Sequence, residues 1–310
     1  MKIVIPGAAG AIGRALCKRL IARGDQVIGI DRRPWPDAPK ELELHALDVR
    51  KRAAEDVLRR HRPDVVVHIG TVSHITRTRD DERYKINLGG TKAVFEHCER
   101  YEIPHVVFVG RHTYYGAGAD APLYHREDEP PLALSGFPEL ADLVAADLYA
   151  GAALWRVPEM ITTVLRVCYT LGPSGDGTLA TFLRGRRVPT ILGFDPLFQF
   201  MHELDLVDAL VAAVDRRPRG VFNVAGPPPL PLSTIIARAG RTRLPLPEFI
   251  LAALLGHRGL PKLARGALTH LMHPVVIDDQ AFRRATGFVP KHDAPATIAT
   301  FTARHPTPAT

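Results

Sequence analysis

Short apolar runs alternate with amphipathic stretches over the first half of the chain, which predicts strands and helices in turn. Apolar runs predict strands over residues 2–6, 26–31, 44–49, 64–69, 105–110 and 161–167. Helical spacing of apolar residues predicts helices over residues 11–23, 82–101 and 139–156, and a further helix that contains Val57. The runs DVVVHI and HVVFVG are almost continuously apolar, which is typical of strands buried on both faces of a parallel sheet. The pattern therefore predicts an α/β fold, a Rossmann-type doubly wound parallel sheet.

Proline and glycine become denser after about Gly172, in GPSGDG and AGPPPLPL, and the regular alternation ends there. We therefore predict a dinucleotide-binding Rossmann domain over residues 1–172. A smaller C-terminal substrate-binding region should follow over residues 173–310, with some crossing of the chain between the two. This region should close a cleft at the carboxyl ends of the strands, where doubly wound folds bind their ligands.

Three glycines, Gly7, Gly10 and Gly13, follow the first predicted strand and open the first predicted helix. Glycines at such spacing permit a tight turn and a close approach of the backbone to a pyrophosphate. The helix N-terminus then offers free N–H groups to the phosphates. An acidic residue, Asp31, ends the next strand and completes a dinucleotide-binding pattern.

Residues 31–33 bear on whether the cofactor is NAD or NADP. A carboxylate at Asp31 can accept hydrogen bonds from the adenosine ribose hydroxyls and would repel a 2′-phosphate, which favours NAD. Arg32 and Arg33 follow at once and could instead bind a 2′-phosphate, so NADP remains the less favoured alternative.

The charge of the chain limits the classes of partner. The formal net charge is +7 and the pI is about 9.5, which favours a phosphate-bearing cofactor, an acidic substrate or a membrane surface. Nucleic acid is not predicted as a partner, because the basic residues are scattered and no nucleic-acid module is recognisable.

The cysteines and the apolar runs bear on compartment. Cys17, Cys98 and Cys168 are few and widely spaced, so neither a disulfide framework nor a metal site is predicted, and reduced thiols of a cytosolic protein are expected. The N-terminus becomes glycine-rich too early for a signal peptide. The longest strongly apolar run, residues 249–255, is far shorter than the ~20 residues that span a bilayer. We expect a cytoplasmic protein, with peripheral contact at the inner face of the membrane as an alternative.

Further landmarks follow the glycines in a fixed order. They are Asp48-Val49, His68-Ile69-Gly70, Asn87, Leu165-Arg166 with Gly172-Pro173, Gln199-Phe200-Met201-His202 with Asp205, Phe222-Asn223-Val224 and the terminal ATGFVP. Over roughly residues 1–302 the chain resembles the extended short-chain dehydrogenase/reductase family, the NAD-dependent sugar epimerases and dehydratases. The resemblance implies a cofactor site made of Gly7, Gly10, Ala11, Ile12, Gly13, Asp31, Arg32, Asp48, Val49, Ile69, Gly70, Thr71, Asn87 and Val109.

The catalytic groups of that family are missing from this sequence. The family pattern has a Ser or Thr at the end of the fifth strand, a Tyr, and a Lys four residues after the Tyr. The Lys lowers the pKa of the Tyr, which acts as acid or base. The Tyr and Lys positions are occupied here by Glu139 or Leu140 and by Leu143 or Val144. No tyrosine occurs over residues 125–148, and no lysine over residues 93–261.

Arg111 takes the place of the family's hydroxyl, within the stretch FVGRHTYYG. A guanidinium does not release a proton at working pH, but it can hold an anion or polarise a carbonyl oxygen. His112 titrates near neutrality and Tyr114 carries a phenol, so either is a candidate acid, and Thr113 adds a hydroxyl. Alternation along the strand end predicts His112 and Tyr114 on one face, with Arg111 and Thr113 on the other.

The substrate contacts of the family are also replaced. Tyr169 stands where the resemblance implies an Asn and Phe198 where it implies an Arg, changes that remove diphosphate contacts and add apolar surface. Residues 244–274 are apolar and basic with one acid, Glu248. This segment fits either a helix pair packed on the core, or an amphipathic lip for an apolar substrate or a membrane face.

Three functions remain open from the sequence. The first is an NAD(P)-binding, epimerase/dehydratase-like oxidoreductase with a non-standard acid or base, which acts on an apolar or lipid-like carbonyl or hydroxyl substrate. The second is a catalytically silent NAD-binding scaffold or regulatory module, because all three catalytic groups are absent. The third is a nucleotide-sugar epimerase. We expect a small-molecule substrate, apolar or anionic, and a homodimer formed through two long helices.

Overall fold

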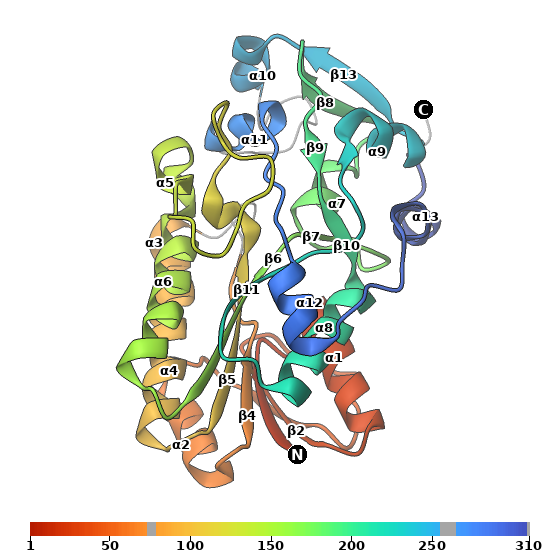
Figure 1. Ribbon diagram of the computed structural model, residues 1–310. Coiled ribbons are helices and arrows are strands. Elements are labelled where there is room, and N and C mark those ends of the chain that lie inside the picture. Colours follow the sequence, from red (N-terminus) through yellow and green to blue (C-terminus); the bar gives the residue numbers. More distant parts are fainter. Residues whose placement is uncertain (73–78, 255–264, 309–310) are drawn as a thin grey trace.

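Seven parallel strands form one central sheet within residues 1–72, 79–254 and 265–308, which the computed structural model describes (Figure 1). Their order across the sheet is β11-β6-β5-β4-β1-β2-β3. The bounds are β1 (Lys2–Pro6), β2 (Gln26–Asp31), β3 (Glu43–Ala46), β4 (Val65–His68), β5 (His105–Arg111), β6 (Ile161–Val167) and β11 (Gly220–Val224). The chain winds from β1 toward β3 in one direction and from β4 toward β11 in the other, so the direction reverses between β1 and β4. This confirms the predicted Rossmann-type sheet.

Helices cover both faces of this sheet (Figure 1). One face carries α1 (Ala11–Ala22), α8 (Glu203–Arg216) and α12 (Gln280–Thr286), and the other carries α2 (Arg52–His61), α4 (Gly90–Arg100) and α6 (Ala141–Arg156). Along β1, Ile3 and Ile5 pack into the first layer and Val4 into the second. Both faces of the strand are therefore apolar, which explains the near-continuous apolar runs of the sequence.

Two predicted elements differ in detail from the structure. The predicted helix over residues 82–101 is α3 (Asp80–Tyr84), a π-helical turn (Lys85–Gly89) and α4 in continuous succession. The predicted third strand over residues 44–49 pairs only as far as Ala46. Beyond it, the Asp48 carboxylate accepts a hydrogen bond from the Arg50 backbone N–H at 3.0 Å, which turns the chain away from the sheet edge.

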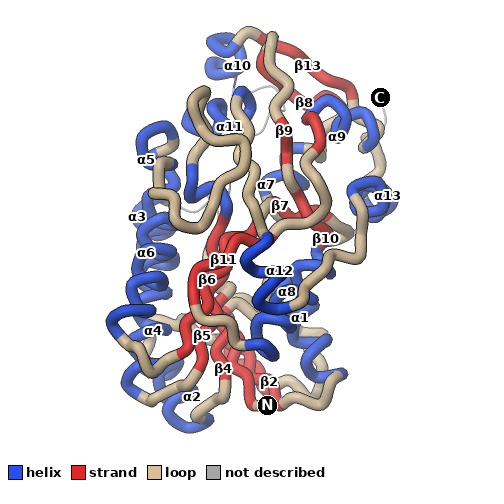
Figure 2. The backbone as a smooth tube through the Cα atoms, in the orientation of Figure 1, coloured by secondary structure: helices blue, strands red, loops and turns tan. Residues whose placement is uncertain are grey.

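The remaining elements lie mainly beyond the carboxyl ends of the strands (Figures 1 and 2). They are β7 (Tyr169–Leu171), β8 (Arg187–Ile191), β9 (Leu197–Phe198), β10 (Phe200–His202), β12 (Leu230–Pro231), β13 (Thr242–Leu246), α5 (Ala133–Gly136), α7 (Thr178–Phe182), α9 (Leu232–Arg238), α10 (Glu248–Leu254), α11 (Thr269–Met272) and α13 (Ala294–Arg304). Many of these elements share an apolar core of their own around Leu183, Ile235 and Phe301. Because α8 and β11 return to the central sheet, the chain crosses between the two regions after residue 172. The boundary at residue 172 stays a prediction.

The segment 244–274 is described only in part, because residues 255–264 lie outside the described residues. Its described portion contributes the end of β13, then α10, a 3₁₀ turn (Arg265–Leu268) and α11. No described helix has the length and apolar character needed to cross a bilayer.

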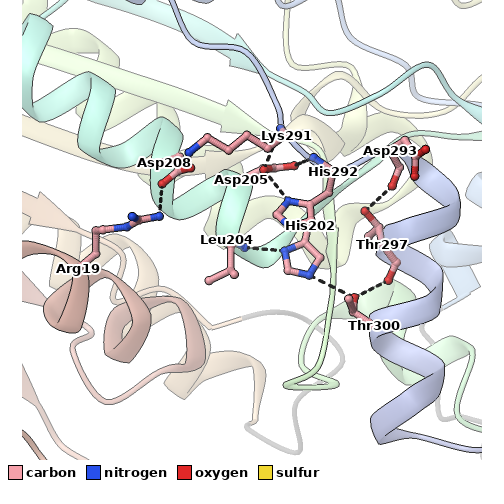
Figure 3. Close-up of polar contacts among 10 residues, drawn as sticks. All are labelled: Arg19, His202, Leu204, Asp205, Asp208, Lys291, His292, Asp293, Thr297 and Thr300. Atoms are coloured by element: carbon pink, nitrogen blue, oxygen red, sulfur yellow. Dashed lines mark hydrogen bonds and ion pairs between the residues drawn. The ribbon is translucent and has the colours of Figure 1, made fainter.

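The His202–Asp205 signature ties the two regions together (Figure 3). The Nδ1 atom of His202 accepts a hydrogen bond from the Leu204 N–H at 3.0 Å and caps α8, and its Nε2 lies 3.1 Å from the Thr300 hydroxyl on α13. Asp205 is fully buried and accepts hydrogen bonds from the backbone N–H groups of Lys291 and His292, both at 3.1 Å. The signature is therefore a structural joint between α8 and the chain that enters α13.

Candidate functional site

A cavity of about 470 Å³ opens at the carboxyl ends of the strands, where the winding direction reverses. It is lined by thirteen of the fourteen predicted cofactor residues: Gly7, Gly10, Ala11, Ile12, Gly13, Asp31, Arg32, Asp48, Val49, Ile69, Gly70, Thr71 and Val109. Arg111, His112, Thr113, Tyr169 and Thr178 line the same cavity. The structure thus brings the dinucleotide pattern and three of the candidate catalytic residues into one space.

The glycines of the first turn are required by close backbone contacts. Gly7 has a φ of +97°, and a Cβ there would lie 2.7 Å from the Gly70 nitrogen on the neighbouring strand end. A Cβ on Gly13 would overlap the carbonyl oxygens of Gly7 and Ala8. Among the described residues, no side chain caps the N-terminus of α1, whose first residues line the cavity. This is the arrangement that binds a pyrophosphate in a dinucleotide fold.

Asp31 is held in place by its neighbours at the end of β2. Its carboxylate accepts hydrogen bonds from the Ala9 N–H at 3.0 Å, the Arg33 N–H at 2.9 Å and the Arg33 guanidinium at 3.0 and 3.1 Å. Burial acts to raise the pKa of Asp31, but the bonds from Arg33 and Ala9 outweigh it and hold the pKa below its ordinary value. Asp31 is therefore ionised at the point where an adenosine ribose is expected, and Arg33 offsets its charge.

Asn87 is the predicted cofactor residue that does not line the cavity. It is fully buried in the π-helical turn, where its amide accepts from the Val72 N–H at 2.7 Å and donates to the Val72 carbonyl at 2.9 Å. It also donates to Asp142 at 2.7 Å. Asn87 thus holds the backbone at Val72, in the chain that follows β4 and lines the cavity. π-Helical turns often occur beside functional sites.

The candidate catalytic stretch turns where β5 ends. Arg111 is the last strand residue, and residues 112–115 form a 3₁₀ turn. The predicted alternation of faces is wrong, because the chain leaves the extended conformation at His112. Tyr114 does not line the cavity, and its ring lies under the Arg166 guanidinium, whose carbon is 3.5 Å from the ring centre. A catalytic role for Tyr114 has no support in this placement.

His112 is buried and its hydrogen bond fixes its tautomer. Its Nδ1 lies 3.0 Å from the Val167 carbonyl, which only accepts, so the proton is on Nδ1 and Nε2 carries a lone pair. Burial, together with nearby charge on His270 and Arg111, lowers the pKa of His112 to about 3. At neutral pH, Nε2 therefore has no proton to give, which disfavours His112 as a general acid and makes it a hydrogen-bond acceptor.

Arg111 carries a guanidinium without an acidic partner among the described residues. Its Nε atom is buried and has no hydrogen-bond partner within the described part of the chain. Burial lowers the pKa of Arg111, while Asp142 acts on it favourably from beyond ion-pair distance. Thr113 lines the cavity beside it with a hydroxyl.

The family's catalytic positions for Tyr and Lys, at the start of α6, hold neither group here. At the corresponding positions, Leu140 and Val144 are buried in the core, and neither Glu139 nor Leu143 lines the cavity. Asp142, in the first turn of the same helix, is buried and polar, and the sequence pattern did not single it out. Its carboxylate lies 3.4 Å from the Arg83 guanidinium. The pairing spans 59 residues, so no local pattern announces it.

A second, apolar cavity of about 40 Å³ continues from the first and shares Thr113, Tyr169 and Thr178 with it. Its other walls are Phe137, Leu179, Phe182, Phe198, Ala267, His270 and Leu271. The Tyr169 ring stacks on Phe198 at 5.5 Å and meets the His112 ring edge-on at 4.4 Å. The two family substrate positions replaced by aromatic residues therefore form one apolar wall, which the sequence indicated. The contributions of Phe137 and His270 were not anticipated.

Outside the cavity, the ligand atoms of Glu43, His45 and His61 lie within 4.8 Å of one another on the β3 side of the sheet. Both imidazoles contact the same Glu43 oxygen, at 2.9 and 3.1 Å. The three cysteines are buried, and burial raises the pKa of each thiol.

Comparison with known proteins adds independent evidence. Residues 3–225 match the model of the NAD dependent epimerase/dehydratase family. An uncharacterized protein of Mycobacterium tuberculosis is 30% identical over 303 residues, which covers 93% of this chain and 80% of the relative. A Streptomyces protein named 3-diazoavenalumate denitrifying reductase is 28% identical over 315 residues, covering 94% and 97% of the two chains.

Solved structures share the fold at low identity. A UDP-glucose 4-epimerase from Thermus thermophilus in complex with NAD superposes with a TM-score of 0.77 at 19% identity, covering 98% of this chain and 99% of the other. MoeE5 in complex with UDP-glucuronic acid and NAD gives a TM-score of 0.75 at 24% identity, covering 98% of each chain.

Proposed function

Because the chain belongs to the NAD dependent epimerase/dehydratase family, we propose that it is an oxidoreductase that transfers a hydride between a nicotinamide cofactor and a compact substrate beside Arg111. Family membership confirms the predicted resemblance to the extended short-chain dehydrogenases. The family name and the solved NAD complexes support NAD as the cofactor. NADP stays the less favoured alternative for this chain.

One observation carries the proposal. The dinucleotide cradle and the stretch Arg111–Thr113 line the same cavity, while the described lining contains no lysine and one tyrosine, Tyr169. The turn at Gly7–Gly13 would hold the pyrophosphate and Asp31 the adenosine ribose. The bound cofactor would supply or accept the hydride.

The residues of the chain then have separable roles. Arg111 provides a fixed positive charge that stabilises an oxyanion or holds an anionic group, and Thr113 can donate a hydrogen bond. The Nε2 atom of His112 carries a lone pair and can accept a hydrogen bond. This set stabilises charge without a proton relay, which suits acceptors whose reduced product is stabilised as an anion and takes its proton from water.

The substrate class follows from the walls of the cavity. Tyr169 and Phe198 stack where the resembled family contacts a diphosphate, so an apolar substrate fits better than a nucleotide sugar. One relative is named 3-diazoavenalumate denitrifying reductase. Its name describes a reductase and mentions no nucleotide sugar, which supports this choice of reaction and substrate class. A small-molecule substrate is thus proposed, and the expected homodimer and peripheral membrane contact stay predictions.

The test is cofactor oxidation by the purified protein. NADH and NADPH should each be followed at 340 nm with a panel of ketones, enones and quinones. Arg111→Met should lower kcat by roughly 10²–10³-fold, the size of effect seen when one charge-stabilising group is lost. Arg60→Met, an exposed change on α2, is the matched control and should leave kcat unchanged. Turnover that survives Arg111→Met undiminished would reject this role for Arg111.

A second function is favoured by the absence of Tyr and Lys from the family's catalytic positions at the start of α6. A silent NAD-binding module would bind cofactor in calorimetry and show no turnover with any member of the panel. A coupled assay with UDP-sugars tests the third alternative, a nucleotide-sugar epimerase, which the stacked Tyr169 and Phe198 disfavour.

A further inference from the structure

Unlike the other arginines around the cavity, Arg111 forms no ion pair with a carboxylate of the described residues. Arg33 binds Asp31 at 3.0 Å and Arg50 binds Asp48 at 2.6 Å, both at the adenosine end. Arg83 faces Asp142 and Arg166 faces Asp147 in the buried layer behind the cavity. No described carboxylate lies within ion-pair distance of Arg111, and its Nε is buried without a partner. A buried cation is stabilised by a nearby anion, and no carboxylate of the described residues supplies one here.

None of the described acids around the cavity lies within ion-pair distance of Arg111. Asp142 acts on it electrostatically from farther away, with its Oδ2 engaged by Asn87 at 2.7 Å and its Oδ1 buried without a partner. Among the acids of the lining, Glu203 is hydrogen-bonded to the Ser174 hydroxyl, and Asp176 acts electrostatically on Arg33. A ligand is therefore the source that we consider for an anion paired with Arg111.

The charge of the site limits which anion fits. The lining contains no lysine among the described residues, and its other arginines, Arg32, Arg33 and Arg50, all contact acids. A phosphate dianion is normally met by more than one cation, whereas one guanidinium matches one carboxylate through two parallel hydrogen bonds. The local charge therefore selects a carboxylate.

The size of the second, apolar cavity (the side cavity) limits the size of the apolar part of the ligand. Its volume of about 40 Å³ exceeds the ~10–15 Å³ that one water needs and is far below the ~150 Å³ of a cavity that holds benzene. Phe137, Phe198 and Leu271 make its walls apolar. A short apolar group fits there, and a whole ring does not.

We propose that Arg111 binds the carboxylate of a small substrate acid whose short apolar end enters the cavity between Tyr169 and Leu271. This inference rests on the proposed function, because it places the acid in the space beside the nicotinamide. It makes Arg111 a substrate-specificity residue in addition to any charge stabilisation during transfer.

The experiment is calorimetric titration of the NAD-loaded protein with matched acids and amides. Crotonate and hexanoate are compared with crotonamide and hexanamide, which have the same shape without the charge. The acids should bind at least tenfold more tightly than the amides. Arg111→Met should abolish that preference, Arg111→Lys should keep part of it, and Arg60→Met should keep all of it. Leu271→Trp, which fills the side cavity, should weaken hexanoate more than acetate.

Three results would overturn the inference. They are equal binding of acids and amides, a preference that survives Arg111→Met, and an Arg111→Met loss of NAD affinity as large as the loss of acid affinity. The last would make Arg111 a cofactor ligand. The outcomes separate this inference from the proposed function. An intact acid preference without turnover rejects the function alone, whereas turnover of neutral ketones without acid preference rejects the inference alone.

Discussion

Two arginines on neighbouring strands, the buried Arg166 and the partly buried Arg111, have opposite surroundings. Arg166 on β6 pairs in the sheet with Gly110, and the next residue along β5 is Arg111. Arg166 contacts Asp147 at 2.9 Å, the Tyr115 hydroxyl at 3.0 Å and the Glu127 carbonyl at 3.1 Å. Burial acts to lower the pKa of Arg166, but Asp147 outweighs it and raises the pKa, whereas burial lowers the pKa of Arg111.

The difference separates a structural charge from a functional one. Arg166 has acceptors on its neighbours, and removing it would strand a buried carboxylate. Arg111 lines a cavity and has no acidic partner among the described residues, so its charge is available to a ligand. Uncompensated charges in clefts are typical of binding and catalytic sites.

The largest expected effect is on the Arg166 side. Arg166→Met leaves Asp147 buried and unpaired, which should lower the free energy of unfolding by about 3–5 kcal/mol. Urea unfolding followed by circular dichroism measures the change. The double variant Arg166→Met, Asp147→Leu should recover much of the loss, because no buried charge remains. A single variant as stable as the parent would contradict the structural role of Arg166.

Acid should also destabilise the protein, because several of its imidazoles are buried. Burial lowers the pKa of His112 to about 3, and that of His68, His105 and His270 to about 4. The unfolded chain binds these protons near pH 6.5 and the folded chain does not, so stability is complete above pH 6.5 and falls as pH drops toward 4. Each histidine contributes at most ~1.4 kcal/mol per pH unit over that window.

Unfolding titrations at pH 7, 6, 5 and 4.5 measure that slope. Replacing one of the four, as in His270→Leu, should remove roughly a quarter of it. A flat profile between pH 6.5 and 4 would show that these imidazoles are protonated in the folded protein.

A smaller effect is expected from Arg111 itself on stability. Arg111→Met removes a partly desolvated charge without stranding a described carboxylate, so the free energy of unfolding should change by less than about 1 kcal/mol, or rise. The same variant should lose most of its activity, which separates it from Arg166→Met. A loss of several kcal/mol would mean that Arg111 has an internal partner.

Changes at Asp31 and Arg33 should alter the preference between NAD and NADP. Asp31→Asn removes the charge that repels a 2′-phosphate and should shift the NAD-to-NADP affinity ratio toward NADP by roughly tenfold, ~1.4 kcal/mol. Arg33→Met should shift the ratio the other way, because it frees the Asp31 carboxylate. Calorimetric dissociation constants for both cofactors measure the ratio, and an unchanged ratio in both variants would place the 2′ position elsewhere.

Much of the fold followed from local pattern. The strand runs and the glycine turn are set by neighbours in sequence, and thirteen of the predicted cofactor residues do line one cavity. The catalytic stretch was harder to predict. Tyr114 was expected in the cleft and lies under Arg166 instead, because the chain turns at His112 and the guanidinium offers a flat cation to its ring.

The sequence by itself determined which groups are present: a glycine turn before a helix, an acid after the second strand, and no Tyr and Lys at the family's catalytic positions. Only the tertiary structure decided which charges are neutralised. Asp142 meets Arg83 across 59 residues and Asp147 meets Arg166 across 19, while Arg111 meets no described acid. Pairing depends on distances in space, which local periodicity does not encode, and so the lone cation of the site became visible only in the folded chain.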